Sequence, residues 1–582
     1  MRVRSVVIHG HFYQPPREDP WLDEVEAEPS AAPFHDWNER VERQCYRAVV
    51  AARLYAPDGR IARIVNTLAS VSFDFGPTLL EWLERAAPAT YAAVLEADRA
   101  SREKHDGHGN AIAMPYHHVI LPLASHRDKV TEVRWGIADF RRRFGREPVG
   151  MWLPETAVDP ETLDVLAAEG IQFTILAPHQ VEGAPADGMP GWYRTPGGRS
   201  IALFVYDGPL SHDVAFGPLL SDAAAWAERL VAPGKPGSEP RLVAIATDGE
   251  TYGHHHRFGE VALAWLLREL ERRAGVRVEN FAAFLARHPP EREVKLVAPT
   301  SWSCPHGVER WRADCGCRLA PEHPSQQRWR APLREALDWL AGELHARFEG
   351  EGAELFADPW AARDAYGAVV SADGASIARF AADRMRHPGD PAARVRAREL
   401  LELERNALRM FTSCGWFFDD IAGIEAVQIL HYAARGVELA GTEAPRLEAG
   451  VLERLARAHS NEPGEGTGRD VYLNHVKRRV PVESAARTDA HAADSGDDAA
   501  RALLRAVLAL EHDHSPRAIA AVTELADRAQ RDGGHIPFDA QTAFYRIRAA
   551  APPERAAQLA SVAWRLGFAD GEVEGKGKGG SH

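Results

Sequence analysis

Seven short apolar runs rich in β-forming residues alternate with helix-like segments in the first 250 residues. These runs lie at residues 5–8, 61–68, 111–114, 149–153, 172–176, 201–206 and 242–246. Most of the intervening stretches, such as residues 77–86 and 129–144, carry apolar residues at helical spacing. Alternation of strand and helix is typical of a parallel sheet covered by helices. Seven such units predict an α/β fold, a distorted (β/α)7 barrel.

Two of these runs end in carboxylates. Pro154 cannot donate a ladder hydrogen bond, so a strand stops near it and leaves Glu155 at the strand's C-terminal mouth. The last run is followed by Asp248 and Glu250. A lone glutamate here would be interpreted as a surface or capping residue, because most glutamates are exposed. Two strand-end carboxylates, however, are what a pair of catalytic acids requires.

Three segments resemble signature motifs of glycoside hydrolase family 57. They read Trp-Leu-Pro-Glu at 152–155, Asp-Gly-Glu at 248–250 and His-Gly-His-Phe-Tyr-Gln-Pro-Pro at 9–16, in matching order and spacing over roughly residues 1–310. The family contains α-amylases, 4-α-glucanotransferases and α-glucan branching enzymes on a (β/α)7 barrel with a helical C-terminal region. The resemblance implies a retaining glycoside hydrolase or transglycosylase that acts on α-1,4-linked glucans and has a maltooligosaccharide or α-glucan as its partner.

The resemblance also implies roles for the carboxylates. Glu155 matches the family's nucleophile and Asp248 its acid/base. In a retaining enzyme the two carboxyl groups lie about 5–5.5 Å apart, and the acid holds a proton at the start. Burial or a nearby negative charge should therefore raise the pKa of Asp248. Glu250 could supply that charge, or it could bind a sugar hydroxyl.

Other polar residues are assigned to the substrate site by the same resemblance. His9 and His11 point to one side if the strand continues through them, and with Gln14 they belong to the first motif. His118 resembles part of a further motif, and His254 continues the segment after Asp248. Alternative interpretations are that the first two histidines are core residues or that they chelate zinc.

Three tryptophans are candidate platforms for a sugar ring. Trp152 and Trp302 lie beside the motifs, and Trp416 interrupts two helical stretches. The apolar face of a pyranose packs on an indole, whose N–H can bind a hydroxyl. A role in the core is as reasonable for Trp416.

The sequence departs from the family at residues 109–112. Many members carry Gly-x-x-Glu there, whereas this chain reads Gly-Asn-Ala-Ile. A carbohydrate-binding protein without catalysis is therefore one alternative function. A metal-dependent carbohydrate deacetylase on a similar barrel, using His-x-His as ligands, is another.

Cys304, His306, Cys315 and Cys317 are a further candidate metal site. Zinc modules usually separate paired ligands by two to four residues, whereas the gaps here contain one. The spacing favours a compact loop with buried thiols beside Trp302 and Trp311. The sequence prediction is therefore no metal and no cofactor.

Composition limits the remaining possibilities. A formal net charge of −14 argues against nucleic acid as a partner. The chain has no run of about 18 apolar residues, which indicates no membrane span, and its start resembles a strand more than a signal peptide. Five cysteines in 582 residues do not form a disulfide framework, so a cytoplasmic location is expected. The oligomeric state is left open.

The chain is expected to divide into five segments. The barrel spans residues 1–320 and a helical domain spans 321–457, with a polar linker or insertion at 458–497. A second helical block follows at 498–567, and a Gly-, Lys- and Glu-rich tail, expected to be disordered, at 568–582.

Overall fold

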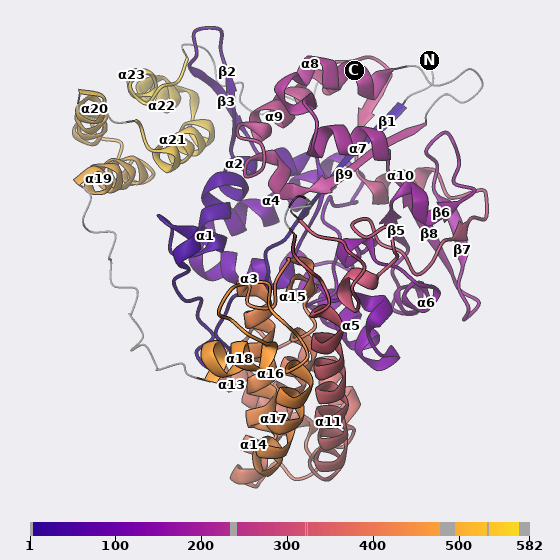
Figure 1. Ribbon diagram of the computed structural model, residues 1–582. Helices are drawn as coiled ribbons and strands as arrows, with labels where there is room; N and C mark the ends of the chain where they lie inside the picture. Colours follow the sequence, from indigo (N-terminus) through magenta and orange to yellow (C-terminus); the bar gives the residue numbers. More distant parts are fainter. Residues whose placement is uncertain are drawn as a thin grey trace.

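The computed structural model describes residues 4–232, 241–319, 322, 324–477, 495–531 and 535–569 (Figure 1). Strand β1 pairs in parallel with β4 and with β9, and β5 pairs in parallel with β8. Single parallel bridges at residues 111–113 and 150–151 connect β4 to β5. The backbone N–H of Asp207, just after β8, donates to the carbonyl of Ala244 in β9 over 2.8 Å. These contacts close a distorted seven-stranded barrel, and the predicted fold class is confirmed. Its named strands are β1 (Arg4–Phe12), β4 (Ser72–Phe75), β5 (Phe173–Leu176), β8 (Ser200–Val205) and β9 (Leu242–Asp248).

One of the seven predicted strands is not part of the barrel. Strands β2 (Ala52–Tyr55) and β3 (Ile61–Val65) form an antiparallel hairpin, so the run at residues 61–68 does not supply the second barrel strand. That strand is β4, which reads Ser-Phe-Asp-Phe. Because every second side chain of β4 is polar and faces the lumen, it does not form the continuous apolar run typical of a buried parallel strand.

The two-residue period of the strands separates two cores. In β1, Val6 and Ile8 pack outward against the helices, whereas Val7 packs into the lumen. Phe281 fills the lumen from α10. The polar side chains of His9 and His11 follow Val7 on the lumen side, so the barrel is apolar at its floor and polar at its C-terminal mouth.

Helices surround the barrel, and smaller β-elements extend it. The described helices here are α1 (Trp37–Val41), α2 (Arg47–Val49), α3 (Pro77–Ala86), α4 (Pro88–Lys104), α5 (His126–Phe144), α6 (Pro160–Ala168), α7 (Gly208–Ala215), α8 (Ala223–Val231), α9 (Gly259–Glu271) and α10 (Phe281–Arg287). The additional strands are β6 (Val181–Glu182), β7 (Gly191–Arg194), β10 (Val276–Val278) and β11 (Lys295–Leu296).

A helical domain lies against the mouth of the barrel, at the bottom of Figure 1. Its segment at residues 410–423 reaches back to the barrel, where Thr412 bridges to Val119 and the Ser413 N–H donates to the His118 carbonyl over 3.0 Å. The domain therefore forms one wall of the mouth. Its helices are α11 (Arg330–Leu355), α12 (Pro359–Tyr366), α13 (Gly374–Arg384), α14 (Pro391–Arg409), α15 (Cys414–Phe417), α16 (Ile424–Leu439) and α17 (Ala444–Leu455).

Residues 458–477 differ from the predicted linker. They continue the helical domain through α18 (Gly468–Val471), and Tyr472 is buried there. The Asn461 side chain also accepts from the Gln326 N–H over 2.9 Å. The rest of the predicted linker, residues 478–494, and most of the predicted tail, residues 570–582, lie outside the described residues.

The second helical block packs on the β2–β3 hairpin, at the upper left of Figure 1. The Ile61 N–H donates to the Gly567 carbonyl over 3.0 Å, and Ile61 shares an apolar cluster with Phe544. The hairpin therefore anchors this block to the barrel domain. The block comprises α19 (Ser495–Ala509), α20 (Pro516–Arg531), α21 (Phe538–Ala550), α22 (Pro553–Gln558) and α23 (Ala560–Arg565).

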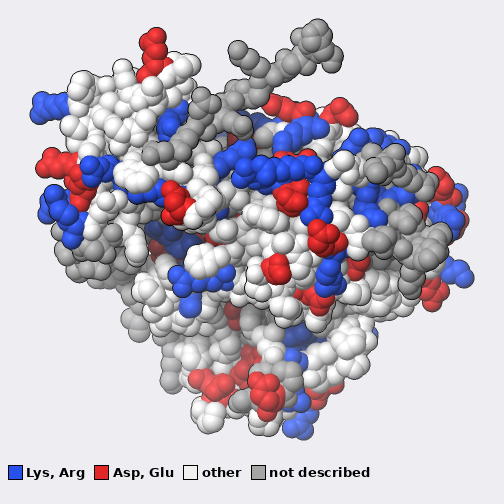
Figure 2. Space-filling model, turned by 90° about the horizontal axis from the view of Figure 1, so that it is seen from above, with Lys and Arg blue, Asp and Glu red and all other residues white. Residues whose placement is uncertain are grey.

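Figure 2 shows basic and acidic side chains intermixed on the face seen from above. Among the helices of the described residues, none combines the length and the apolar character needed to cross a bilayer.

Candidate active site

A cavity of about 1090 Å³ opens between the C-terminal ends of the barrel strands and the helical domain. It gathers most of the predicted site residues, namely His11, Gln14, His118, Glu155, Asp248, Glu250, His254 and Trp302. His9, Trp152 and Trp416 do not line it.

Glu155 has a strained backbone and a tightly held side chain. Its φ of 57° lies in the left-handed region, as does the φ of 48° at Thr156. Such conformations are uncommon for residues other than glycine and gather at functional sites. The Glu155 Oε2 accepts from the Trp302 indole N–H over 3.0 Å and from the Ser303 hydroxyl over 2.6 Å. Ser303 was not predicted from sequence, because it follows Trp302 outside the recognised motifs.

Asp248 ends strand β9 with its side chain exposed to the cavity. Although the side chain is exposed to the cavity, protein surrounds its carboxyl group. The resulting reduction in hydration raises the pKa of Asp248 to about 6. His11 opposes the shift, and the negative charges of Glu155 and Asp74 add to it. The expected rise in pKa is thus present, but its main charged causes are these two carboxylates and not Glu250.

Glu250 is a buried carboxylate at the edge of the same cavity. Its Oε1 accepts from the Tyr13 backbone N–H over 3.1 Å and from the Tyr46 hydroxyl. Burial, together with the charge of Asp248, raises its pKa to about 7. Gly249 lies between the two acids. A larger residue does not fit at this position, because a Cβ there would lie 2.2 Å from the Phe12 ring.

Asp74 connects the two histidines of the first motif. Its carboxylate accepts from His9 Nε2 over 3.1 Å and from His11 Nδ1 over 2.8 Å. Asp74 was missed from sequence because strand β4 was not recognised, although its register places it directly opposite His11. The remaining ring nitrogens face Ser72 and His118, so all four nitrogens of the pair are hydrogen-bonded. The two histidines that could chelate a metal are thus both hydrogen-bonded to other protein side chains.

The protonation of this network follows from its charges. Burial alone would lower the pKa of His11, but Asp74, Asp248 and Glu250 raise it to about 9. Burial and the His11 charge place the pKa of His118 well below its usual value. His11 Nε2 therefore donates to His118 Nε2 over 3.2 Å, and His118 Nδ1 donates to the Ser413 hydroxyl over 2.7 Å. His118 also has a φ of 56°, so it is a third residue near the site in the left-handed region.

The three tryptophans occupy different environments. Trp302 lines the cavity, whereas Trp152 is buried beneath it and stacks on His9 and His11 at ring distances of 4.9 and 5.3 Å. Trp416 is also buried, and its indole N–H donates to the Arg330 carbonyl over 3.3 Å. Neither buried indole is a sugar platform in this structure, so those two predictions are wrong. Aromatic residues absent from the sequence prediction do line the cavity: Tyr13, Trp37, Tyr206, Phe216, Phe417 and Phe418.

The segment without the family's glutamate packs inside the barrel. Ile112, at the position of that glutamate, packs in the apolar lumen cluster. Asn110 is buried, and its side-chain oxygen accepts from the Asn280 amide over 2.9 Å. His254, in contrast, lines the cavity and hydrogen-bonds Gln44 over 2.6 Å.

Comparisons with known proteins agree with this architecture. Residues 12–297 match the model of glycosyl hydrolase family 57, and residues 326–495 match a domain of unknown function, DUF3536. The exo-type maltose-forming amylase of Pyrococcus sp. ST04 has a similar structure, with a TM-score of 0.63 and 16% identity over 81% of this chain and 88% of that chain. This likeness shows a shared fold.

Two curated relatives match a shorter region. An α-amylase of Pyrococcus horikoshii is 24% identical over 186 residues, which cover 31% of this chain and 28% of that protein. A 4-α-glucanotransferase of Thermococcus litoralis is 24% identical over 187 residues, which cover 31% of this chain and 26% of that protein. The matched region thus spans little more than a quarter of either relative.

Proposed function

We propose, starting from the chain's membership of glycoside hydrolase family 57, that it is a retaining enzyme acting on α-1,4-linked glucans. Glu155 is the nucleophile and Asp248 is the acid/base. One observation carries this proposal: a single cavity holds two carboxyl groups with opposite environments. Two donors hold Glu155 in place, whereas the surroundings of Asp248 favour its protonated form. Environments that divide two carboxyl groups in this way separate an acid from a nucleophile.

The chemistry follows from these two roles. Asp248 donates its proton to the glycosidic oxygen while Glu155 attacks the anomeric carbon from the opposite face. Both hydrogen bonds to Glu155 are made at Oε2, so we assign the attack to Oε1. The ionised Asp248 then removes a proton from the acceptor, which displaces Glu155 and restores the α configuration. Water as acceptor gives hydrolysis, and a sugar hydroxyl gives transfer.

The cavity lining supports a glucan as substrate. Its exposed aromatic side chains suit the apolar faces of pyranose rings, and its carboxylates and histidines suit the hydroxyls. The relatives named above include both an amylase and a glucanotransferase, and both reactions use the same carboxyl groups.

Product analysis tests the proposal. The full chain is incubated with maltoheptaose or glycogen, and products are separated by length and branching, with Glu155→Gln as the inactive control. We expect shorter products alone for hydrolysis, or shorter and longer products together for transfer. Tight binding of maltoheptaose without any product, or release of acetate from acetylated sugars that stops with a chelator, would contradict the proposal.

A further inference from the structure

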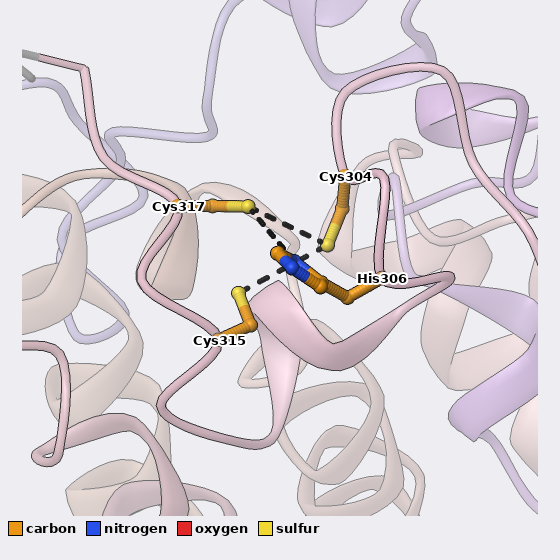
Figure 3. A group of neighbouring side chains, drawn as sticks. All are labelled: Cys304, His306, Cys315 and Cys317. Carbon is orange, nitrogen blue, oxygen red and sulfur yellow. Dashed lines mark hydrogen bonds between the residues drawn. The ribbon is translucent and has the colours of Figure 1, made fainter.

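Four potential metal ligands converge beside the active site (Figure 3). Cys304, His306, Cys315 and Cys317 each present one ligand atom, and all four atoms lie within 4.8 Å of one another. The Cys304 Sγ lies 3.8 Å from the Cys317 Sγ and 4.0 Å from the Cys315 Sγ. The Cys317 Sγ lies 3.5 Å from the His306 Nδ1. The group is therefore three thiols and one imidazole around a common point.

We propose that these residues bind one structural Zn²⁺ ion. With Zn–S bonds of about 2.3 Å and a Zn–N bond of about 2.0–2.1 Å, a regular tetrahedron has S···S edges of about 3.8 Å and S···N edges of about 3.5 Å. The separations of 3.8 and 4.0 Å between sulfur atoms and of 3.5 Å between sulfur and nitrogen are close to those edges, and the other pairs of ligand atoms lie within 4.8 Å. They are far longer than the roughly 2.05 Å of a disulfide bond.

The backbone explains how ligands only two positions apart can share one ion. Gly316, between Cys315 and Cys317, has a φ of 78°, a left-handed conformation that turns the chain between them. Gly307 follows His306 with a φ of 86°, and a Cβ there would lie 2.7 Å from the Pro299 carbonyl. The sequence prediction of no metal rests on ligand spacing, and the turn at Gly316 removes that objection for Cys315 and Cys317.

The site connects the nucleophile's loop to the helical domain. Trp302 and Ser303, which hold Glu155, directly precede Cys304, and Cys304 is buried in the helical-domain core. On the other side, the Arg330 guanidinium in α11 donates to the Cys317 carbonyl over 2.8 Å. Four protein ligands leave no open coordination position, so the ion holds the loop and takes no part in chemistry.

Metal analysis of the full chain tests the proposal. The protein is produced without a polyhistidine tag or chelator, and zinc is measured per chain. We expect about one zinc in the wild type and in Cys45→Ala, whose cysteine lies in the barrel core outside the cluster. We expect a loss of most of the zinc in Cys315→Ser and Cys317→Ser. Substoichiometric zinc in the wild type that is not restored by added zinc would overturn the proposal, as would full zinc in both serine variants.

A second measurement applies if the serine variants do not fold. Wild-type protein in which zinc is replaced by Co²⁺ should show the intense thiolate-to-cobalt charge-transfer absorption and tetrahedral d–d bands, and zinc should abolish both. Absence of the charge-transfer band in cobalt-loaded protein would exclude thiolate ligation. Neither measurement uses enzyme activity, so a zinc-containing protein without action on glucans would contradict only the proposed function.

Discussion

At the residue scale, the charge of the candidate active site depends on which of its neighbouring groups are protonated. The pKa values of Asp248, Glu250 and His11 are raised to about 6, 7 and 9, and Asp74 interacts with two of these three groups. His11 is thus positively charged at neutral pH and partly offsets the carboxylates. Because these groups interact, titration of the site reports the cluster, and variants are needed to assign each step.

The first prediction concerns the pH profile of kcat/KM on maltoheptaose. In the proposed mechanism Asp248 is protonated in the first step, so kcat/KM should fall as the pH rises through about 6, roughly tenfold for each pH unit above it. With α-glucosyl fluoride, whose leaving group needs little protonation, the wild type should show little of this decline, whereas Glu250→Gln should retain the decline on maltoheptaose. A decline of equal size on both donors, or its loss on maltoheptaose in Glu250→Gln, would assign it to another group.

The position of the two proposed catalytic carboxylates at strand ends could be predicted from sequence, whereas the residues that contact them could not. Glu155 and Asp248 each follow an apolar strand run, a position that carries chemistry in barrels. Asp74 lies inside a polar strand that sequence periodicity did not reveal, and Ser303 lies in an irregular loop. Trp416 shows the reverse error, since an aromatic residue in a helix break is buried in the domain interior.

At the element scale, the segment between α14 and α16 completes the cavity. Phe417 and Phe418 line the wall opposite the barrel strands, and the Arg310 guanidinium lies 3.7 Å from the Phe417 ring centre. Sequence alternation predicted the barrel and the helical region, but it could not predict which helical segment returns to the mouth. That depends on non-local contacts such as the bridge from Thr412 to Val119.

The second prediction tests this wall. Phe418→Ala removes an aromatic surface from the cavity while leaving the carboxylates in place. Loss of about 1 kcal/mol of stacking should raise KM for maltoheptaose roughly fivefold with little change in kcat. Phe258→Ala is the matched control, because Phe258 is an exposed phenylalanine outside the cavity lining. Equal KM values for the two variants would show that Phe418 does not contact the substrate.

At the scale of the whole molecule, a buried ion cluster joins the barrel to the helical domain. The Arg363 guanidinium of α12 lies 2.8 Å from Asp128 of α5 and 2.7 Å from Glu404 of α14. His345 of α11 lies 2.9 Å from Glu404. Burial is the largest single influence and opposes both charges, but the ion pairs and hydrogen bonds within the cluster together outweigh it. The pKa of Glu404 is therefore lowered and that of His345 is raised to about 10.

The third prediction is that this cluster stabilises the whole chain. Arg363→Leu removes one of the two cations that face Asp128 and Glu404, so the free energy of unfolding should fall by about 3–5 kcal/mol. Arg134→Leu removes a half-exposed arginine that pairs with Asp364 and Glu169, and it should cost about 1 kcal/mol or less. Urea unfolding followed by circular dichroism compares the two variants. An equal loss of unfolding free energy in the two variants would contradict the prediction that the buried ion pairs of Arg363 stabilise the chain more than the exposed pairs of Arg134.

The same cluster should make the free energy of unfolding depend on pH. The stabilisation from Glu404 is present when the pH lies above the pKa of this group in the unfolded chain. It is lost as the pH falls through the lowered pKa of the folded state. The contribution of His345 is present below its unfolded pKa and is lost as the pH rises towards about 10. The cluster should therefore stabilise the chain less at both extremes of pH.

The most direct test of the two-carboxylate assignment is the anomeric configuration of azide products. Glu155→Ala should lose turnover but keep its fold, because a cavity-facing carboxylate contributes little packing. Azide can then attack an activated α-glucosyl donor from the vacated face, so a single inversion should give a β-glucosyl azide. Asp248→Ala should still form the glycosyl-enzyme with the same donor, and azide should then give the α-glucosyl azide. The predicted result is β-azide from the first variant and α-azide from the second. The same anomer from both variants, or wild-type rates on α-glucans in either, would contradict the assignment.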